Sequence, residues 1–165
     1  MSPSEHLSGS AVQTDAEAQI ISSLAEKWGV PLIHKPGKIH LTGEVAIEVD
    51  ARSPDGDVVV EAYARQGVLK GAQLKKIAQD ILKLALFKQE EGRENTRTVI
   101  AFASQEAHDS VKGWVRQAAA SFGVEMVVIE VSDDLREQIR RAQSRQVMVN
   151  LDQVADDVAA PGVSA

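Results

Sequence analysis

The fold is decided by residues 44–88, which read EVAIEVDARSPDGDVVVEAYARQGVLKGAQLKKIAQDILKLALFK. Small apolar and charged residues alternate along Ala46–Ser53 and Asp57–Arg65, as they do in strands with one buried face. Residues 54–56 (PDG) between them have strong turn chemistry, so the two segments are predicted to form a β-hairpin. A helix from about residue 72 to residue 89 follows, because apolar residues recur there at helical spacing.

The predicted hairpin gathers acidic side chains on one face. A turn centred on Asp55 sets Asp50 roughly opposite Glu61, and the same register sets Glu48 roughly opposite Tyr63. Side chains two residues apart on a strand share a face. Carboxylates gathered in this way repel one another unless a cation lies among them, and a divalent metal ion could be that cation. The residues on this face are Glu48, Asp50, Glu61, Tyr63 and Arg65.

Composition limits the classes of protein that fit. A chain of 165 residues is most simply one domain, and 44% hydrophobic residues suffice for one buried core. The formal charge of −6 argues against a broad basic surface for nucleic acid. The absence of cysteine excludes disulfides and thiolate metal sites. No apolar run has membrane-spanning length and no secretory leader is recognisable, so the cytoplasm is the expected location.

The rest of the chain predicts a single domain over residues 15–149. Residues 1–14 are rich in small residues without periodicity and are predicted to be disordered, and residues 150–165 are predicted to form a flexible tail. The order helix, three antiparallel strands, helix, strand, helix, strand, helix predicts an α/β protein whose mixed sheet is flanked by helices. The elements expected besides the hairpin and the helix after it are a helix at 15–28, strands at 39–41, 98–103 and 124–131, and helices at 106–122 and 133–146.

This order, with an acid on each of two neighbouring strands, resembles the PD-(D/E)XK nuclease superfamily, the restriction-endonuclease-like fold with its α-βββ-α-β-α-β core. The resemblance covers roughly residues 15–131. The family pattern is an Asp, a spacer of variable length and then Glu-X-Lys, and Asp50 and Glu61 stand at its acidic positions. Glu17 stands where the family often has a Glu on the first helix. Gln73 stands where several relatives have a Gln at the start of the next helix.

The chain departs from the family pattern at the lysine. Tyr63 stands two residues after Glu61, where the family has Lys. Some members of the family have moved that lysine to another element, and some have lost catalysis. A lysine on the adjacent helix could hold the attacking water, whereas an arginine could only stabilise charge on phosphate. The candidates for a relocated cation are Arg65, Lys70, Lys76 and Lys83.

The resemblance implies a phosphodiesterase that acts on DNA with Mg²⁺ or Mn²⁺. A metal ion between Asp50 and Glu61 would polarise the scissile phosphate and lower the pKa of a bound water. Glu17 and Glu48 could add direct or water-mediated contacts to it. A homodimer is expected by analogy with small nucleases that cut two strands with two subunits. The catalytic residues implied are Asp50, Glu61, Tyr63, Arg65, Gln73 and Lys76.

Other interpretations of the same residues stay open. The missing lysine and the acidic balance favour a nuclease-like module that has lost catalysis and serves in binding or assembly. The polar face of the hairpin could also be the solvated face of an antiparallel sheet, without any site. Glu17 could close a capping box with Thr14 at the start of the first helix. His6, His34, His40 and His108 do not have the spacing of a zinc site.

Overall fold

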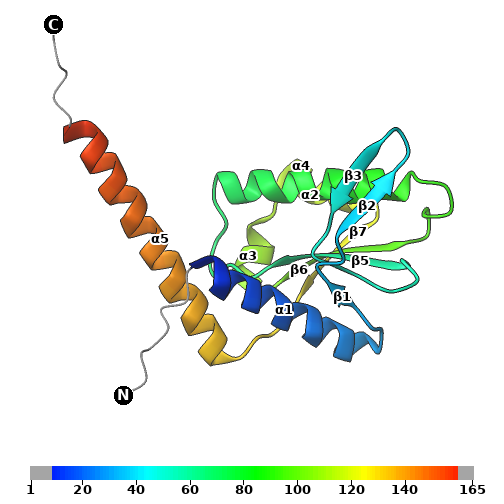
Figure 1. Cartoon of the computed structure of the whole chain (residues 1–165), viewed down its shortest axis with the longest axis horizontal. Coiled ribbons are helices and arrows are strands. Elements are labelled where there is room, and N and C mark those ends of the chain that lie inside the picture. Colours follow the sequence, from blue (N-terminus) through cyan, green and yellow to red (C-terminus); the bar gives the residue numbers. More distant parts are fainter. Residues whose placement is uncertain (1–8, 160–165) are drawn as a thin grey trace, which may run out of the picture.

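The computed structural model describes residues 9–159 as a mixed α/β protein (Figure 1). Within these residues five helices accompany a five-stranded sheet and a separate two-stranded sheet. The predicted order of helices and strands is confirmed in this coarse form. None of the helices in the described range is both long and apolar enough to cross a membrane. The elements are α1 (Gly9–Trp28), β1 (Ile33–His34), β2 (Lys38–Leu41), β3 (Val45–Glu48), β4 (Ala51–Arg52), β5 (Val58–Tyr63), α2 (Ala72–Lys88), β6 (Arg97–Phe102), α3 (Gln105–Ser110), α4 (Gly113–Ser121), β7 (Val124–Val128) and α5 (Asp133–Ala159).

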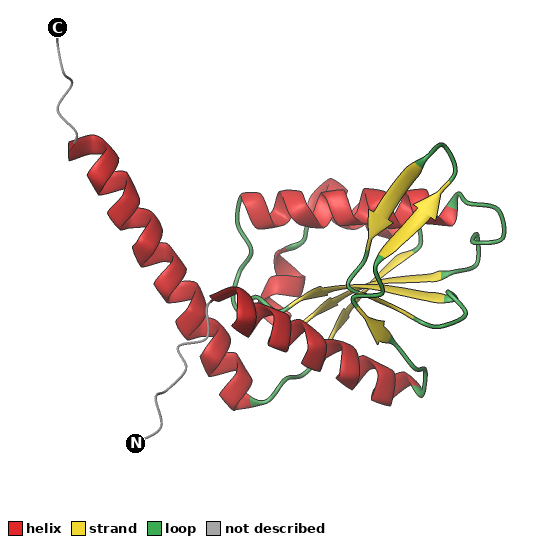
Figure 2. Cartoon of the chain, viewed as in Figure 1, coloured by secondary structure: helices red, strands yellow, loops and turns green. Residues whose placement is uncertain are grey.

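The larger sheet has the order β1-β4-β5-β6-β7, with β5 in the middle. β1, β4 and β5 are antiparallel, while β5, β6 and β7 are parallel. All six residues of β5 and nearly all of β6 are buried, which fits their apolar, β-branched sequences. α1 and α5 cover one face of the sheet, and α2, α3 and α4 cover the other (Figure 2).

The predicted hairpin strand 46–53 is divided between the two sheets. β3 pairs with β2 in the small sheet, and β4 pairs with β5 in the large one. Two residues, Val49 and Asp50, join β3 to β4, whereas three residues, 35–37, join β1 to β2 on the paired segment. The unequal joints act as a bulge and bend the long hairpin from one sheet into the other. The predicted register between β4 and β5 is confirmed, because Ala51 pairs with Val60.

Both predicted irregular ends contain helix where the structure describes them. α1 begins at Gly9, inside the segment 1–14 that was predicted to be disordered, and residues 1–8 lie outside the described range. α5 continues to Ala159, through much of the predicted tail 150–165, and the later part of this helix extends away from the sheet (Figure 1). Residues 160–165 are also outside the described range. α1 and α5 pack against each other through apolar residues that include Ile20 and Ile139.

The predicted helix at 106–122 is two helices, α3 and α4, joined at Val111 and Lys112. Val111 is fully buried, as expected. Helical spacing over a single helix at 106–122 would turn Trp114 and Phe122 toward the core. Instead 74% of Trp114 and 49% of Phe122 are exposed, because the break after α3 turns the start of α4 outward.

Candidate functional site

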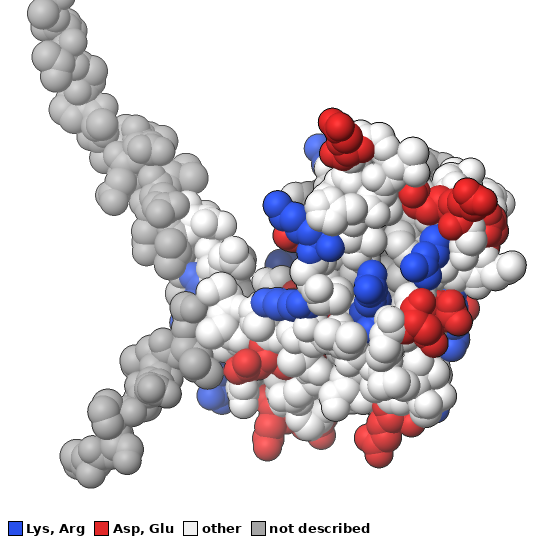
Figure 3. All heavy atoms as spheres, turned by 45° about the vertical axis from the view of Figure 1, so that its right-hand side comes forward, with Lys and Arg blue, Asp and Glu red and all other residues white. Residues whose placement is uncertain are grey.

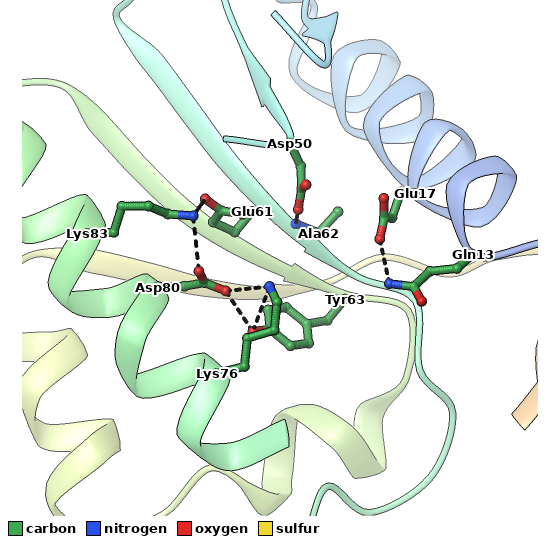
Figure 4. Close-up of polar contacts among 9 residues, drawn as sticks. All are labelled: Gln13, Glu17, Asp50, Glu61, Ala62, Tyr63, Lys76, Asp80 and Lys83. Atoms are coloured by element: carbon green, nitrogen blue, oxygen red, sulfur yellow. Dashed lines mark hydrogen bonds and ion pairs between the residues drawn. The ribbon is translucent and has the colours of Figure 1, made fainter. Parts of the chain in front are cut away.

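Asp50 lies at the point where the sheet edge opens. The regular ladder between β4 and β5 ends at Ala51. One further hydrogen-bonded pair would bring the Val49 carbonyl to the Ala62 amide, but Val49 has left the ladder for the bend. Asp50 Oδ2 accepts a hydrogen bond from the Ala62 amide at 2.8 Å instead. The carboxylate thus replaces a missing backbone acceptor and is held at the edge of β5 (Figure 4).

Glu61 lies on the face of β5 that is covered by α2, and only 2% of its surface is exposed. Lys83 Nζ is 2.5 Å from Glu61 Oε1, so a lysine from α2 supplies the cation that the sequence lacks at position 63. Burial, followed by the charges of Asp50 and Asp80, raises the pKa of Glu61 to about 8 against the opposing effect of Lys83. Figure 4 shows Glu61 directed toward Lys83 and Asp50 directed toward the Ala62 amide.

Asp80 connects this ion pair to two further polar side chains. One carboxylate oxygen, Oδ1, is 3.1 Å from Lys83 Nζ. The other, Oδ2, accepts a hydrogen bond from the Tyr63 hydroxyl at 2.7 Å and is 3.0 Å from Lys76 Nζ. Burial and the nearby Asp80 carboxylate raise the pKa of Tyr63 well above its usual value, so its hydroxyl stays protonated and acts as a donor. Asp80 therefore fixes the side chains around Glu61.

Sequence reasoning missed Asp80 as a site residue. Gln73, Lys76, Asp80 and Lys83 follow one another along a polar flank of the predicted helix, which suggests exposure, but Asp80 is only 4% exposed. A signal was present in the spacing, because Asp80 lies three residues after Ile77 and four before Leu84, on the apolar stripe itself. A charged residue on such a stripe needs a buried partner, which pointed to the lysines one turn away.

A hollow of about 480 Å³ lies beside Asp50, between the ends of β5 and α2 and the helices α1 and α5. Six of the eight predicted site residues line it, contributed by α1, the bend before β4, β5 and the segment after it, and the start of α2. Residues far apart in the sequence are thereby brought to one place. These six are Glu17, Asp50, Tyr63, Arg65, Gln73 and Lys76.

The other two predicted residues, Glu48 and Glu61, do not line this hollow. Glu48 pairs with Lys38 across the small sheet and is exposed, so the bend in the hairpin removes it from the face it was predicted to share with Asp50. Glu61 is buried between β5 and α2, where it contacts Lys83. Of the cations considered as replacements for the missing lysine, Lys83 contacts Glu61 and Lys76 contacts Asp80.

Glu17 enters the hollow from the middle of α1. The capping-box interpretation is wrong, because Thr14 lies inside the helix and does not begin it. The Glu17 carboxylate instead accepts a hydrogen bond from Gln13 Nε2 at 3.0 Å, one turn earlier (Figure 4). Partial burial raises the pKa of Glu17, the Gln13 hydrogen bond lowers it, and the charge of Asp50 raises it again. Asp50 is thus electrostatically coupled to acids on both sides of it.

The charge pattern sets limits on a metal ion and on a nucleic-acid surface. Within residues 9–159 no three His, Asp or Glu side chains converge closely enough to hold a metal ion. A Mg²⁺ ion would need only one or two carboxylates, with water filling its other positions. On the face drawn in Figure 3, the coloured Lys and Arg side chains are interspersed with Asp and Glu and form no continuous basic patch.

Comparison with known proteins adds no assignment. No protein-family model, no curated protein sequence and no solved structure that was searched matches the chain.

Proposed function

We propose that the chain is a metal-dependent phosphodiesterase of the PD-(D/E)XK type that acts on DNA, with a restriction-endonuclease-like core. One observation carries the proposal: the amino group of Lys83 lies 2.5 Å from the Glu61 carboxylate. Asp50 directly precedes β4, and its carboxylate accepts a hydrogen bond from the Ala62 amide, next to Glu61 in β5. A lysine therefore contacts Glu61 although the sequence has Tyr63 at the usual position of the lysine.

The arrangement of the elements supports the same proposal. α1 precedes three antiparallel strands of the large sheet, β1, β4 and β5, and then α2 leads to the parallel strand β6. Glu61 lies on the third of these strands and Asp50 in the bend directly before the second, and the small β2–β3 sheet extends the first two beyond the bend. The resemblance predicts an acid on each of these two strands.

The donor atoms fit a hard divalent cation. One oxygen of Asp50 is engaged by the Ala62 amide, while the other makes no hydrogen bond with any described residue. When bound, the metal would polarise a phosphate and lower the pKa of a bound water. The side chains of Asp50 and Glu61 would hold it, and Lys83 would orient Glu61. Lys76 and Arg65, which line the hollow, would bind phosphate oxygens.

A second candidate function rests on the burial of Glu61. This carboxyl group is 2% exposed, is absent from the lining of the hollow and has a pKa near 8, so at neutral pH it is mostly protonated. A protonated, enclosed acid is a poor metal ligand. These properties favour a nuclease-like module that binds or assembles without catalysis. The expected homodimer is compatible with either function and stays a prediction.

Calorimetric titration with Mg²⁺ and Mn²⁺ separates a metal site from a purely structural cluster. We expect wild type to bind and Asp50→Asn to bind at least about tenfold more weakly, because one of few carboxylate ligands is lost. Glu48→Gln serves as the matched control, since Glu48 is exposed and outside the hollow. No heat with wild type, or equal binding by Asp50→Asn, would remove the basis of the metal-dependent function.

Incubation with plasmid and single-stranded DNA in Mn²⁺ then distinguishes the two candidates. Cleavage by wild type that is lost in Lys83→Met would support the phosphodiesterase. Metal binding without cleavage of either DNA would support the inactive module.

A further inference from the structure

The hollow beside Asp50 is walled on one side by α5, and this wall is firmly attached. The side-chain amide of Gln143 pairs with the backbone of Gln66, accepting from its N–H at 2.8 Å and donating to its carbonyl at 3.2 Å. Leu135 and Ile139, 3% and 5% exposed, anchor the first turns of α5 in the core it shares with α1. Asp50 therefore lies in a half-open hollow and not on a flat face.

The size of this space limits what can reach Asp50. A volume of about 480 Å³ lies in the range of roughly 300–1,000 Å³ that encloses one small-molecule-sized group. A nucleotide that stays paired and stacked in a duplex keeps its base inside the helix and cannot fill such a hollow. A nucleotide from an unpaired strand can, without the unstacking cost of a few kcal/mol that a duplex would require.

The polar groups of the hollow suit a base and a phosphate. Gln73 Oε1 accepts from the Lys70 amide at 3.0 Å, which leaves its NH₂ group free to donate. The side chain of Gln146, exposed on α5, makes no hydrogen bond with any residue in the described range. Carboxamides can donate to and accept from the edge of an unpaired base. Arg65 also has no hydrogen-bond or ion-pair partner among the described residues, and a guanidinium matches a phosphate.

A second hollow, of about 560 Å³, continues from the first and shares Arg65, Gln73 and Gln143 with it. Lys70 and the exposed Val68 also line it, which offers a cation and an apolar surface to the next nucleotide. Arg65 stands where the two hollows meet. The formal charge of −6 indicates contact with few phosphates, in keeping with a short bound segment.

We infer that the site takes an unpaired strand of nucleic acid: one nucleotide occupies the hollow beside Asp50, and the backbone passes Arg65 into the second hollow. The inference rests on the proposed function for the chemistry at Asp50, and it adds the substrate class. Arg65 holds the phosphate between the two hollows, and Gln146 and Gln73 contact the base.

The test measures binding separately from cleavage. A short fluorescein-labelled single strand, and a duplex that contains the same strand, are titrated with the full chain in Ca²⁺, which also takes oxygen ligands. We expect the single strand to bind at least about tenfold more tightly than the duplex. Arg65→Ala should weaken single-strand binding about tenfold, and Gln146→Ala should weaken it severalfold. Arg140→Ala, an exposed arginine of α5 outside both hollows, should leave binding unchanged.

Four outcomes would overturn the inference: equal or tighter binding of the duplex, no binding of either DNA, wild-type binding by both Arg65→Ala and Gln146→Ala, or a free mononucleotide that competes as well as the strand. Cleavage in Mn²⁺, scored on the same two DNAs, keeps the proposals apart. Selective single-strand binding without any cleavage leaves the inference standing and removes the hydrolytic function. Equal binding and equal cleavage of both DNAs would overturn the inference and leave the hydrolytic function standing.

Discussion

At the scale of single residues, the site is defined by titratable side chains that are buried together. Glu61 and Asp80 are 2% and 4% exposed, and the amino group of Lys83 contacts both carboxyl groups. Removing one member of such a group leaves an uncompensated buried charge, which usually costs several kcal/mol, while the intact group adds little net stability. The arrangement is therefore poorly explained as a device for stability alone, and the pKa of Glu61 gives a way to observe it.

Glu61 should make folding stability depend on pH. Its pKa is about 8 in the folded chain against 4.5 for the ordinary group. Between these values the folded chain retains a proton that the unfolded chain has released, so stability is full below pH 4.5 and declines as the pH rises to 8. We expect wild type to lose up to about 4 kcal/mol of unfolding free energy from pH 5 to pH 8, since one proton is worth about 1.4 kcal/mol per pH unit.

Urea unfolding of wild type and Glu61→Gln at both pH values measures this contribution, because Gln keeps the shape but does not titrate. The unfolding free energy of Glu61→Gln, relative to that of wild type, should increase as the pH rises from 5 to 8. Glu48→Gln should follow wild type, since Glu48 is exposed. A difference that does not change between pH 5 and pH 8 would show that Glu61 titrates normally.

At the scale of elements, two joints place the site: the bend between β3 and β4, and the attachment of α5. Alternation along residues 46–53 predicted the register of β4 against β5 correctly, because cross-strand pairing follows from a turn and a period of two. It could not predict that the strand divides after Glu48, because this depends on the unequal joints of two paired segments. Glu48 was lost from the predicted site for that reason.

The attachment of α5 can be tested at Gln143. Replacing Gln143 with Ala removes both side-chain hydrogen bonds to the Gln66 backbone. We expect a loss of roughly 1–2 kcal/mol in unfolding free energy, because a partly buried N–H and carbonyl lose their partners. Hydrogen exchange at the Gln66 amide should accelerate more than exchange in β6, which pairs within the sheet. Gln138→Ala, an exposed glutamine of the same helix, should change neither quantity.

At the scale of the whole molecule, the hollow lies where the two helical layers meet around the end of β5. α1 and α5 belong to one apolar core and α2 to the other, so the side chains of Glu17 and Lys76 come from opposite faces of the sheet. The sequence singled out six residues that line the hollow, because the acids and the helix amide follow local patterns. Neither the choice of Lys83 among four cations nor the wall made by α5 has a local signal, because both arise from packing between distant segments.

The coupling of Asp50, Glu61 and Asp80 predicts how a bound metal ion would stabilise the molecule. A cation that binds the folded state raises the free energy of unfolding by about 2.7 kcal/mol at a concentration of one hundred times its Kd. Binding requires Glu61 to release its proton, and with a pKa near 8 about half of the molecules have done so at pH 8 but only about one in a hundred at pH 6. The apparent affinity for Mg²⁺ should therefore be about fiftyfold lower at pH 6 than at pH 8.

In thermal unfolding, a fixed Mg²⁺ concentration should raise Tm at pH 8 and have little effect at pH 6. Asp50→Asn should show no Mg²⁺-dependent rise at either pH, which separates the site from weak surface binding. An equal rise at both pH values would mean that Glu61 is not a ligand, and the metal would then have to be held by Asp50 without it.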